Sequence, residues 1–230
     1  MTNEEETPNC KVVLLGETGV GKTCIISRYI RNAFNPETEI STMASFTSKT
    51  LTMNNNTKLR FDIWDTAGQE KYRSLTRFFY KDAAIAVLVY DITRKESFEE
   101  IKTYWVAQLQ ECVNDNLVIG IAGNKSDLFT KEAVKEEEVK EFARSINAVF
   151  MLTSANTGAG VDQLFQCLGE AYLSPDKASR SFSVKDPKNI TLNNNSNPRG
   201  GWRNKNHSFQ NDGDWGNREE EINGLLRRMN

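Results

Sequence analysis

The sequence predicts an α/β fold with three layers, in which helices cover both faces of a six-stranded, mostly parallel sheet. Continuous apolar runs, such as residues 83–90, are typical of strands that are covered on both faces. Segments with apolar residues at helical spacing, such as residues 96–112, alternate with these runs along the chain. The composition, with 38% hydrophobic and 26% charged residues, is that of a soluble globular protein with a sizeable core.

The expected elements follow one another from the first apolar run to a closing helix. An asparagine-rich turn at residues 54–56 tolerates a left-handed backbone, so the two strands that flank it are expected to form a hairpin. Helices separate the other strands, and this order favours parallel pairing. The expected strands are 12–15, 45–53, 58–64, 83–90, 117–123 and 149–152, and the expected helices are 24–30, 96–112, 131–146 and 161–173.

Composition divides the chain into three parts. Residues 10–173 contain the periodic apolar segments and are expected to form one domain. Residues 1–9 are polar, and we expect a flexible N-terminus there. Residues 174–230 have few aliphatic side chains and no periodicity, so they cannot bury enough apolar area to offset the entropy of ordering. We therefore expect residues 174–230 to be a disordered tail.

Charge and cysteine usage argue against several classes of protein. A net charge of −2 does not favour a nucleic-acid-binding protein. The acidic N-terminus lacks the apolar segment of a signal peptide, and no apolar stretch approaches the length of a membrane span. The cysteines are scattered and far from the one histidine, so we expect reduced thiols in a cytoplasmic protein rather than a zinc site or disulfides. These residues are Cys10, Cys24, Cys112, Cys167 and His207.

A glycine-rich stretch between the first strand and the first helix has the spacing G-x-x-x-x-G-K-[ST]. Its glycines let backbone N–H groups and the helix N-terminus surround an oxyanion. Lys22 would add a full positive charge for the β- and γ-phosphates, and the Thr23 hydroxyl would ligate Mg²⁺. The stretch therefore predicts a nucleoside triphosphate site. The predicted residues are Gly16, Glu17, Thr18, Gly19, Val20, Gly21, Lys22, Thr23 and the following Cys24.

Further polar motifs follow three other predicted strands, and ligands of parallel sheets bind beyond such strand ends. Asp65 follows the strand 58–64 and could hold Mg²⁺ through its water shell, because Mg²⁺ keeps several waters and few carboxylates. A single Asp after a strand is more often a helix or turn cap, so its neighbours decide between the two interpretations. The other two motifs are residues 124–127 and 153–155.

These motifs together resemble a known family. Asp-Thr-Ala-Gly-Gln-Glu at residues 65–70 resembles the switch II motif of the Ras superfamily of small GTPases. Asn-Lys-Ser-Asp at 124–127 resembles that family's guanine-recognition motif, and Thr-Ser-Ala at 153–155 its third base-contacting element. Order and spacing agree over residues 10–173, so the resemblance implies a P-loop GTPase domain. Within the superfamily the chain is most similar to the Rab family, on residues 64–75, 79–80 and 90–93.

The resemblance implies how the base would be read. Asp127 would accept two hydrogen bonds from guanine N1–H and the 2-amino group, which adenine cannot offer. Asn124 would brace the loop and contact N7, Lys125 would pack its stem along the base, and the Ala155 N–H would donate to O6. Phe34 matches the aromatic residue that stacks over the base, although ordinary core packing would also explain it. The implied base-binding residues are Phe34, Asn124, Lys125, Asp127, Ser154 and Ala155.

The resemblance also implies slow hydrolysis. Gly68 would donate its backbone N–H to the γ-phosphate, and Gln69 would orient the attacking water. No arginine in the domain is obviously placed to stabilise the transition state, so a rate on the order of 10⁻⁴ s⁻¹ is expected, rising ~10⁵-fold when a partner supplies an arginine. Loss of the γ-phosphate would release residues 35–45 and 66–80, the switch segments that partners read.

Two stretches depart from the Rab pattern. Rab switch I resembles Thr-Ile-Gly, with the threonine as Mg²⁺ ligand, whereas this chain has Ile-Ser-Thr-Met at residues 40–43. Counting without gaps makes Ser41 the ligand, and a shift by one residue makes it Thr42; we prefer Ser41 because no gap is needed. No cysteine follows Cys167, so no prenylation motif is present, and we expect no lipid anchor of that kind.

The resemblance thus implies a Rab-like switch that binds GTP or GDP with Mg²⁺, hydrolyses GTP slowly and regulates vesicle-mediated transport. The expected partners are a GTPase-activating protein, a nucleotide-exchange factor and effectors, all meeting a monomer through switch I and switch II. The protein would be cytoplasmic and would reach endomembranes peripherally, through partners. Two alternatives remain open at this point: a nucleotide-locked scaffold that binds GTP with little hydrolysis, and an ATPase in which Asp127 has no role.

Overall fold

The computed structural model describes residues 7–38, 44–66, 79–112 and 116–174. The expected tail at 175–230 and most of the expected flexible N-terminus lie outside these residues. So do the predicted site residues Ser41, Thr42, Gly68 and Gln69. Within the described ranges, no helix combines the length and apolar character needed to cross a bilayer.

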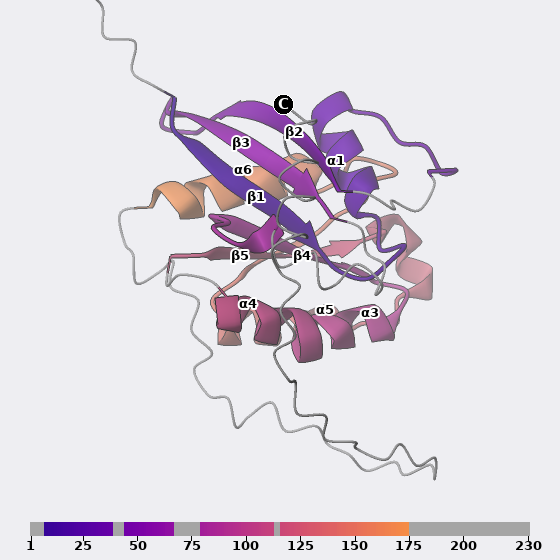
Figure 1. Ribbon diagram of the computed structural model, residues 1–230. Helices are drawn as coiled ribbons and strands as arrows, with labels where there is room; N and C mark the ends of the chain where they lie inside the picture. Colours follow the sequence, from indigo (N-terminus) through magenta and orange to yellow (C-terminus); the bar gives the residue numbers. More distant parts are fainter. Residues whose placement is uncertain (1–6, 39–43, 67–78, 113–115, 175–230) are drawn as a thin grey trace, which may run out of the picture. The chain divides into compact units, whose positions relative to one another are not determined.

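Six strands form one sheet in the order β2-β3-β1-β4-β5-β6 (Figure 1). The hairpin pair β2 and β3 is antiparallel, and every other pair of neighbours is parallel. This arrangement confirms the predicted fold class. The strands are β1 (Asn9–Leu15), β2 (Ser45–Thr52), β3 (Lys58–Asp65), β4 (Ile85–Asp91), β5 (Val118–Asn124) and β6 (Val149–Leu152).

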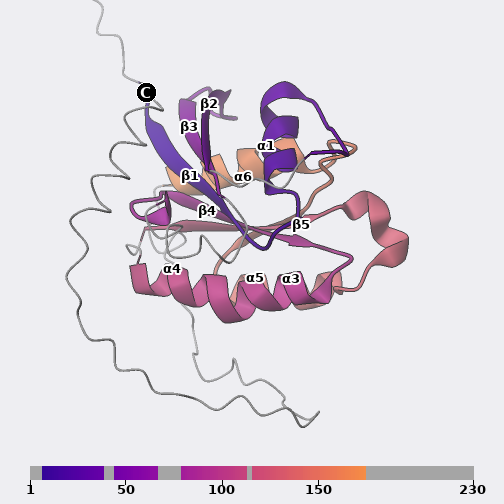
Figure 2. The same cartoon turned by 45° about the vertical axis from the view of Figure 1, so that its right-hand side comes forward.

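Helices cover both faces of the sheet, as predicted (Figure 1, Figure 2). Alternate strand residues serve opposite layers: Leu14 and Val87 pack with α1 and α6, whereas Val13 and Leu88 pack with the helices of the other face. The period of two along each strand therefore yields two hydrophobic layers from one sheet. The helical elements are α1 (Lys22–Arg31), α3 (Lys95–Glu100), η2 (Ile101–Trp105), α4 (Val106–Cys112), η3 (Ser126–Lys131), α5 (Glu136–Ser145) and α6 (Val161–Leu173).

Two helices differ from their predicted form. The expected helix 96–112 is continuous but contains a π-helical turn, η2, between α3 and α4. The expected helix 131–146 begins only at Glu136, because the residues before it bond elsewhere. The backbone N–H groups of Ala133 and Val134 donate to the Ile92 carbonyl at 2.8 and 3.2 Å, and Val134 is buried in the core. A tertiary contact thus replaces the first helical turn that periodicity predicted.

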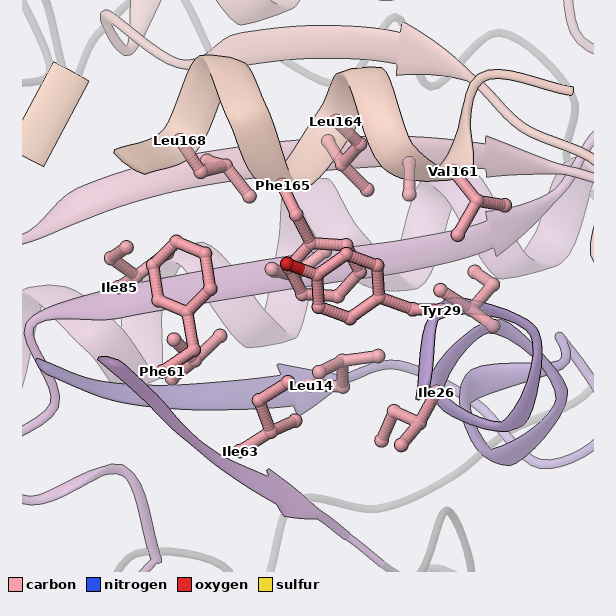
Figure 3. Packing of buried hydrophobic residues seen from close by; sticks show 14 of the residues in the cluster. Leu14, Ile26, Tyr29, Phe61, Ile63, Ile85, Val161, Leu164, Phe165 and Leu168 are labelled. Carbon is pink, nitrogen blue, oxygen red and sulfur yellow. The ribbon is translucent and has the colours of Figure 1, made fainter. Parts of the chain in front are cut away.

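Three aromatic rings fill the layer between the sheet and the helices α1 and α6 (Figure 3). Tyr29 of α1 stacks on Phe165 of α6, with 3.8 Å between the ring centroids and 12° between the planes. Phe61 of β3 lies against the same Phe165 ring at 6.1 Å between centroids. These contacts fix α1 against α6 and β3, and with α1 they fix the glycine-rich loop that precedes it.

The loops after the parallel strands emerge at one edge of the sheet, because parallel strands present their carboxyl ends together. The strand register places Leu14 of β1 beside Asp65 of β3. It also places Asp91 of β4 beside Asn124 of β5. The predicted motifs are therefore brought to the same edge.

Candidate functional site

A cavity of about 460 Å³ opens at this edge of the sheet. Eleven of its lining residues are predicted nucleotide-binding residues: Thr18, Gly19, Gly21, Lys22, Thr23, Cys24, Phe34, Asn124, Lys125, Asp127 and Ala155. The sequence-based prediction missed six others: Asn35, Pro36, Thr38, Thr66, Leu128 and Asn156. The remaining predicted residues of the glycine-rich stretch, and Ser154, form hydrogen bonds with lining residues: Gly16 and Glu17 with Lys22, Val20 with Asn124, and Ser154 with Asp127.

The glycine-rich stretch, residues 16–23, is called the phosphate loop below. Gly21 has a φ of 98°, in the left-handed region, and a Cβ there would collide with the Asn124 side-chain amide. Helix α1 starts directly after Gly21, with no side-chain cap and no acidic residue in its first turn. The first N–H groups of such a helix are available to an anion, and the helix dipole favours one there.

Lys22 lies inside the phosphate loop, and 5% of its surface is exposed. Its Nζ donates to the carbonyls of Gly16 and Glu17 at 2.8 and 3.0 Å. Burial lowers the pKa of Lys22 to about 8, against the opposing effect of the Asp65 carboxylate. The loop carbonyls therefore hold the ammonium group at the wall of the cavity before any ligand binds.

Thr23 and Asp65 meet beside the loop, where the Thr23 hydroxyl donates to Asp65 Oδ2 at 2.6 Å. Asp65 is 2% exposed, and burial raises its pKa although the Thr23 hydrogen bond and the Lys22 charge oppose the shift. Its second oxygen, Oδ1, is buried and has no hydrogen-bond partner in the described part of the chain. An unpaired carboxylate oxygen beside a hydroxyl fits a hard divalent cation.

The predicted Mg²⁺ would take few ligands from these residues. Among the described residues, no group of three or more His, Cys, Asp or Glu side chains could hold a metal ion. Mg²⁺ is usually bound by one or two protein groups, substrate phosphates and waters rather than by an all-protein cage. Thr23 and Asp65 would fit this mode of binding, with phosphate oxygens, waters and the predicted Ser41 or Thr42 as further ligands.

Asp127 faces the opposite end of the cavity, where two side chains hold its carboxylate. The Ser154 hydroxyl donates to Oδ1 at 2.5 Å, and Asn156 Nδ2 donates to Oδ2 at 3.1 Å. Burial opposes the charged form, but these hydrogen bonds outweigh it and hold the pKa of Asp127 below its usual value. Asp127 is thus an oriented, ionised acceptor at neutral pH. Ser154, predicted as a ligand contact, orients Asp127 in this structure.

Asn124 joins the two ends of the cavity. Its Nδ2 donates to the Val20 carbonyl of the phosphate loop at 2.8 Å. Its Oδ1 accepts from the Ala155 N–H at 3.2 Å and from the Thr153 hydroxyl at 3.4 Å. Asn124 thus makes the bracing contacts that the sequence suggested for it. The Ala155 N–H, assigned to the guanine O6, donates to this side chain in the structure.

Residues 153–156, called the base loop below, are held by an arginine that the sequence did not single out. Arg28 of α1 donates from Nε to the Ala155 carbonyl at 2.8 Å and from Nη2 to the Asn156 carbonyl at 2.6 Å. Its Nη1 also donates to Asn32 at the end of α1. Arg28 is 127 positions away from Ala155, so no local motif indicates the contact.

Two further predicted residues have contacts of their own. Phe34 is half-buried, lines the cavity and also packs against the core, so its position agrees with both interpretations of this residue. The Lys125 ammonium forms an ion pair with Asp91 at 2.7 Å, in addition to lining the cavity. Asp91 was not predicted as a site residue, although it is the polar end of the apolar strand β4.

Comparisons with known proteins agree with this geometry. The model of the Ras family matches residues 11–174. The chain is 47% identical over 156 residues to the Ras-related protein Rab-5B of Dictyostelium discoideum, covering 67% of this chain and 71% of that protein. It is 43% identical over 155 residues to human Rab-22A, covering 67% and 79%. It is 44% identical over 184 residues to the Ras-related protein RHN1 of Nicotiana plumbaginifolia, covering 80% and 88%.

Proposed function

Because the chain belongs to the Ras superfamily, and within it to the Rab family of small GTPases, we propose that it is a GTP-dependent switch in vesicle-mediated transport. It binds GTP or GDP with Mg²⁺ and hydrolyses GTP slowly. The supporting observation is a single cavity with a buried cation, Lys22, at one end and an oriented carboxylate, Asp127, at the other. Their chemistry matches the two ends of a guanine nucleotide.

The base end discriminates through the acceptor capacity of Asp127. An ionised carboxylate offers about four lone-pair sites, and Ser154 and Asn156 occupy two of them. The remaining two suit a pair of adjacent donors, which guanine presents as N1–H and the 2-amino group. Adenine has no such pair, so its binding would leave the carboxylate without partners and would be disfavoured.

The phosphate end stabilises negative charge. Lys22, the uncapped start of α1 and the backbone of the phosphate loop would surround the β- and γ-phosphates. Thr23 and Asp65 would hold Mg²⁺, and Mg²⁺ when bound neutralises charge that develops on the phosphate oxygens. Asp65 Oδ1, unpaired and buried, would gain a partner in the ion's ligand shell.

The side chains that line the cavity support the proposal of slow turnover. No arginine of the described ranges lines it, so none of the described arginines would offer a guanidinium to the γ-phosphate there. Gln69 is proposed to orient the attacking water and Gly68 to contact the γ-phosphate. Intrinsic hydrolysis is expected on the order of 10⁻⁴ s⁻¹, with acceleration by an activating protein that provides an arginine.

Partner proteins would bind the switch segments, and described residues in or near these segments form an apolar surface. Phe46, Trp64 and Phe79 form a row with centroid separations of 5.1 and 5.8 Å. Phe46 is 39% exposed and Trp64 and Phe79 are half-buried, so together they form an exposed apolar patch rather than a single exposed side chain. Phe46 follows the first switch segment, Trp64 lies shortly before the second, and Phe79 lies within the second. The row therefore supports effector binding there, in addition to binding of an activator and an exchange factor.

Hydrolysis by the purified full-length chain tests the proposal. We expect slow release of phosphate from GTP, little from ATP at equal concentration, and strong acceleration by an arginine-supplying activator in the wild type only. Gln69→Leu should remove that acceleration. Equal hydrolysis by wild type and Gln69→Leu in the presence of activator would exclude the proposed catalytic role.

Limited proteolysis of switch I separates a switch from a nucleotide-locked scaffold. A switch gives different cleavage patterns with GDP and with a non-hydrolysable GTP analogue, because the γ-phosphate holds the segment. Identical patterns would favour the scaffold and contradict switching. Effective competition by ATP against bound GDP would instead identify an ATPase.

A further inference from the structure

Arg94, which belongs to none of the predicted motifs, contacts the phosphate loop. Arg94 precedes helix α3, and its Nη2 donates to the Thr18 carbonyl at 3.0 Å. The same nitrogen lies 3.3 Å from Glu17 Oε2. One guanidinium group therefore contacts two consecutive residues of the loop that would hold the phosphates.

The other side of the Arg94 guanidinium faces a buried carboxylate. Arg94 Nε lies 3.6 Å from Asp91 Oδ2, and Lys125 Nζ lies 2.7 Å from the same oxygen. The backbone N–H and hydroxyl of Thr93 donate to the other oxygen, Oδ1, at 2.9 and 2.7 Å. The side chain of Asp91 is 3% exposed, so these partners define its position and it serves as a fixed anchor.

The backbone turn at Arg94 is held by hydrogen bonds of its own N–H and carbonyl groups. The Arg94 N–H donates to the Asp91 carbonyl at 3.0 Å, and the Ser97 hydroxyl donates to the Arg94 carbonyl at 2.7 Å. Ser97 is fully buried. The guanidinium therefore projects from a rigid turn, and it can transmit that rigidity to the loop it contacts.

The ion pair between Arg94 and Glu17 affects the electrostatics of the phosphate loop. Its carboxylate is part of a loop that would bind phosphate, where an uncompensated negative charge would repel the ligand. Oε2 is buried and has no hydrogen bond within the described ranges, so the 3.3 Å ion pair with Arg94 compensates its charge, in addition to the nearby Lys22 charge. Two cations, Arg94 and Lys125, balance two anions, Glu17 and Asp91.

We propose that Arg94 is a positioning residue for nucleotide binding, which fastens the Glu17-Thr18 segment to Asp91 and offsets the Glu17 charge beside the phosphates. Asp91 also holds Lys125 of the guanine motif, so one buried carboxylate anchors residues at both ends of the cavity. This inference rests on the proposed binding of guanine nucleotides. Arg94 touches neither end of the expected ligand and acts through the loop.

Dissociation of a fluorescent GDP analogue from the full-length chain tests the inference. We expect Arg94→Ala to release GDP about fivefold faster than wild type, a size that reflects a charge-assisted hydrogen bond discounted for partial exposure. Lys95→Ala is the matched control, because Lys95 is the next residue, is exposed and carries the same charge. It should release GDP at the wild-type rate.

Rescue distinguishes positioning from a general loss of structure. Removing the uncompensated charge with Glu17→Gln in the Arg94→Ala background should return the rate part of the way to wild type, because the Arg94–Thr18 contact stays lost. Preference for GDP over the inosine analogue, which lacks the 2-amino group, should stay constant because Arg94 does not act on the base. If Arg94→Ala does not fold, Arg94→Gln permits the same comparisons.

Three results would overturn the inference. Equal rates for Arg94→Ala and Lys95→Ala would show that the contact does not affect binding. A faster rate that Glu17→Gln leaves unchanged would assign Arg94 to fold stability alone. Wild-type protein that binds neither GDP nor GTP would remove the proposed function together with this inference, whereas the first two results leave the proposed function intact.

Discussion

The two ends of the cavity differ in how completely their polar groups are paired. At the base end, both oxygens of Asp127 accept hydrogen bonds, and Asn124 uses both its donor and its acceptor. At the phosphate end, Asp65 Oδ1 and Thr18 Oγ1 are buried and have no hydrogen-bond partners among the described residues. The base end is therefore preorganised, whereas the phosphate end is completed only when a ligand supplies partners.

Because of this difference in pairing, we expect the two ends of the cavity to contribute differently to nucleotide binding. A buried polar group without a partner costs about 1–3 kcal/mol, so a ligand that pairs it recovers that cost and stabilises the folded chain. The phosphate end should therefore supply most of the binding energy. The base end, whose groups are already oriented, should supply most of the discrimination between nucleotides.

Replacing Lys22 by Met should have the largest effect, because it removes the charge that the phosphate end presents to the ligand. We expect GDP and GTP affinity to fall by at least about 100-fold, in line with the loss of charge-assisted hydrogen bonds. Equilibrium titration with a fluorescent GDP analogue measures the loss. Lys140→Met is the control, because Lys140 lies on α5, is not part of the cavity lining and forms its ion pair with Glu136 of the same helix. An affinity of Lys22→Met within threefold of this control would contradict the role assigned to Lys22.

Asp127→Asn should change the choice of base rather than abolish binding. The amide presents an acceptor oxygen and a donor NH₂ group in place of two acceptor oxygens, so it no longer accepts from both guanine groups but can pair with the N1–H and 2-oxo group of xanthine. We expect GTP to bind on the order of 100-fold more weakly and xanthosine triphosphate to bind better than it does to wild type. Competition between the two nucleotides measures the ratio, and parallel losses for both would show that Asp127 only supports the fold.

Arg28→Ala should weaken the base end indirectly, because Arg28 holds the Ala155 and Asn156 carbonyls. We expect guanine nucleotides to dissociate about tenfold faster, the size of one or two charge-assisted hydrogen bonds in a partly buried site. Arg31→Ala, in the same last turn of α1 but exposed, should leave the rate unchanged. Equal dissociation rates for the two variants would mean that the base loop needs no support from α1.

Asp91 lies between the two ends, and its effect on stability should depend on pH. Its pKa in the folded state is lowered, because hydrogen bonds from Lys125 and Thr93 outweigh its burial. A lowered folded pKa contributes stability above the unfolded pKa of about 4, and this contribution is lost as the pH falls through the folded value. In urea unfolding, the stability difference between wild type and Asp91→Asn should be constant above about pH 5 and narrow below pH 4. A difference that widens in acid would reverse the assigned sign.

The sequence by itself determined the sheet, the phosphate loop and the motifs at the strand ends. These features depend on local patterns: an apolar run marks a buried strand, and Lys22 donates to the carbonyls of Gly16 and Glu17 in its own loop. Parallel strands then bring Asp65, Asn124 and residues 153–155 to one edge. The roles of Ser41, Thr42, Gly68 and Gln69 stay predictions, because they lie outside the described residues.

Only the tertiary structure decided which residues support that site. Arg28 reaches the base loop across 127 positions and Arg94 reaches Thr18 across 76, and neither belongs to a motif. The Ser154 hydroxyl, which no motif pairs with Asp127, donates to that carboxylate, and its predicted contact with the ligand stays a prediction. Val134 leaves its predicted helix because a carbonyl of another loop accepts its N–H. A long side chain such as arginine, or a backbone N–H outside a helix or strand, forms hydrogen bonds with the groups that folding brings close to it. Local sequence therefore specifies the groups that meet the ligand, and packing specifies the groups that hold them.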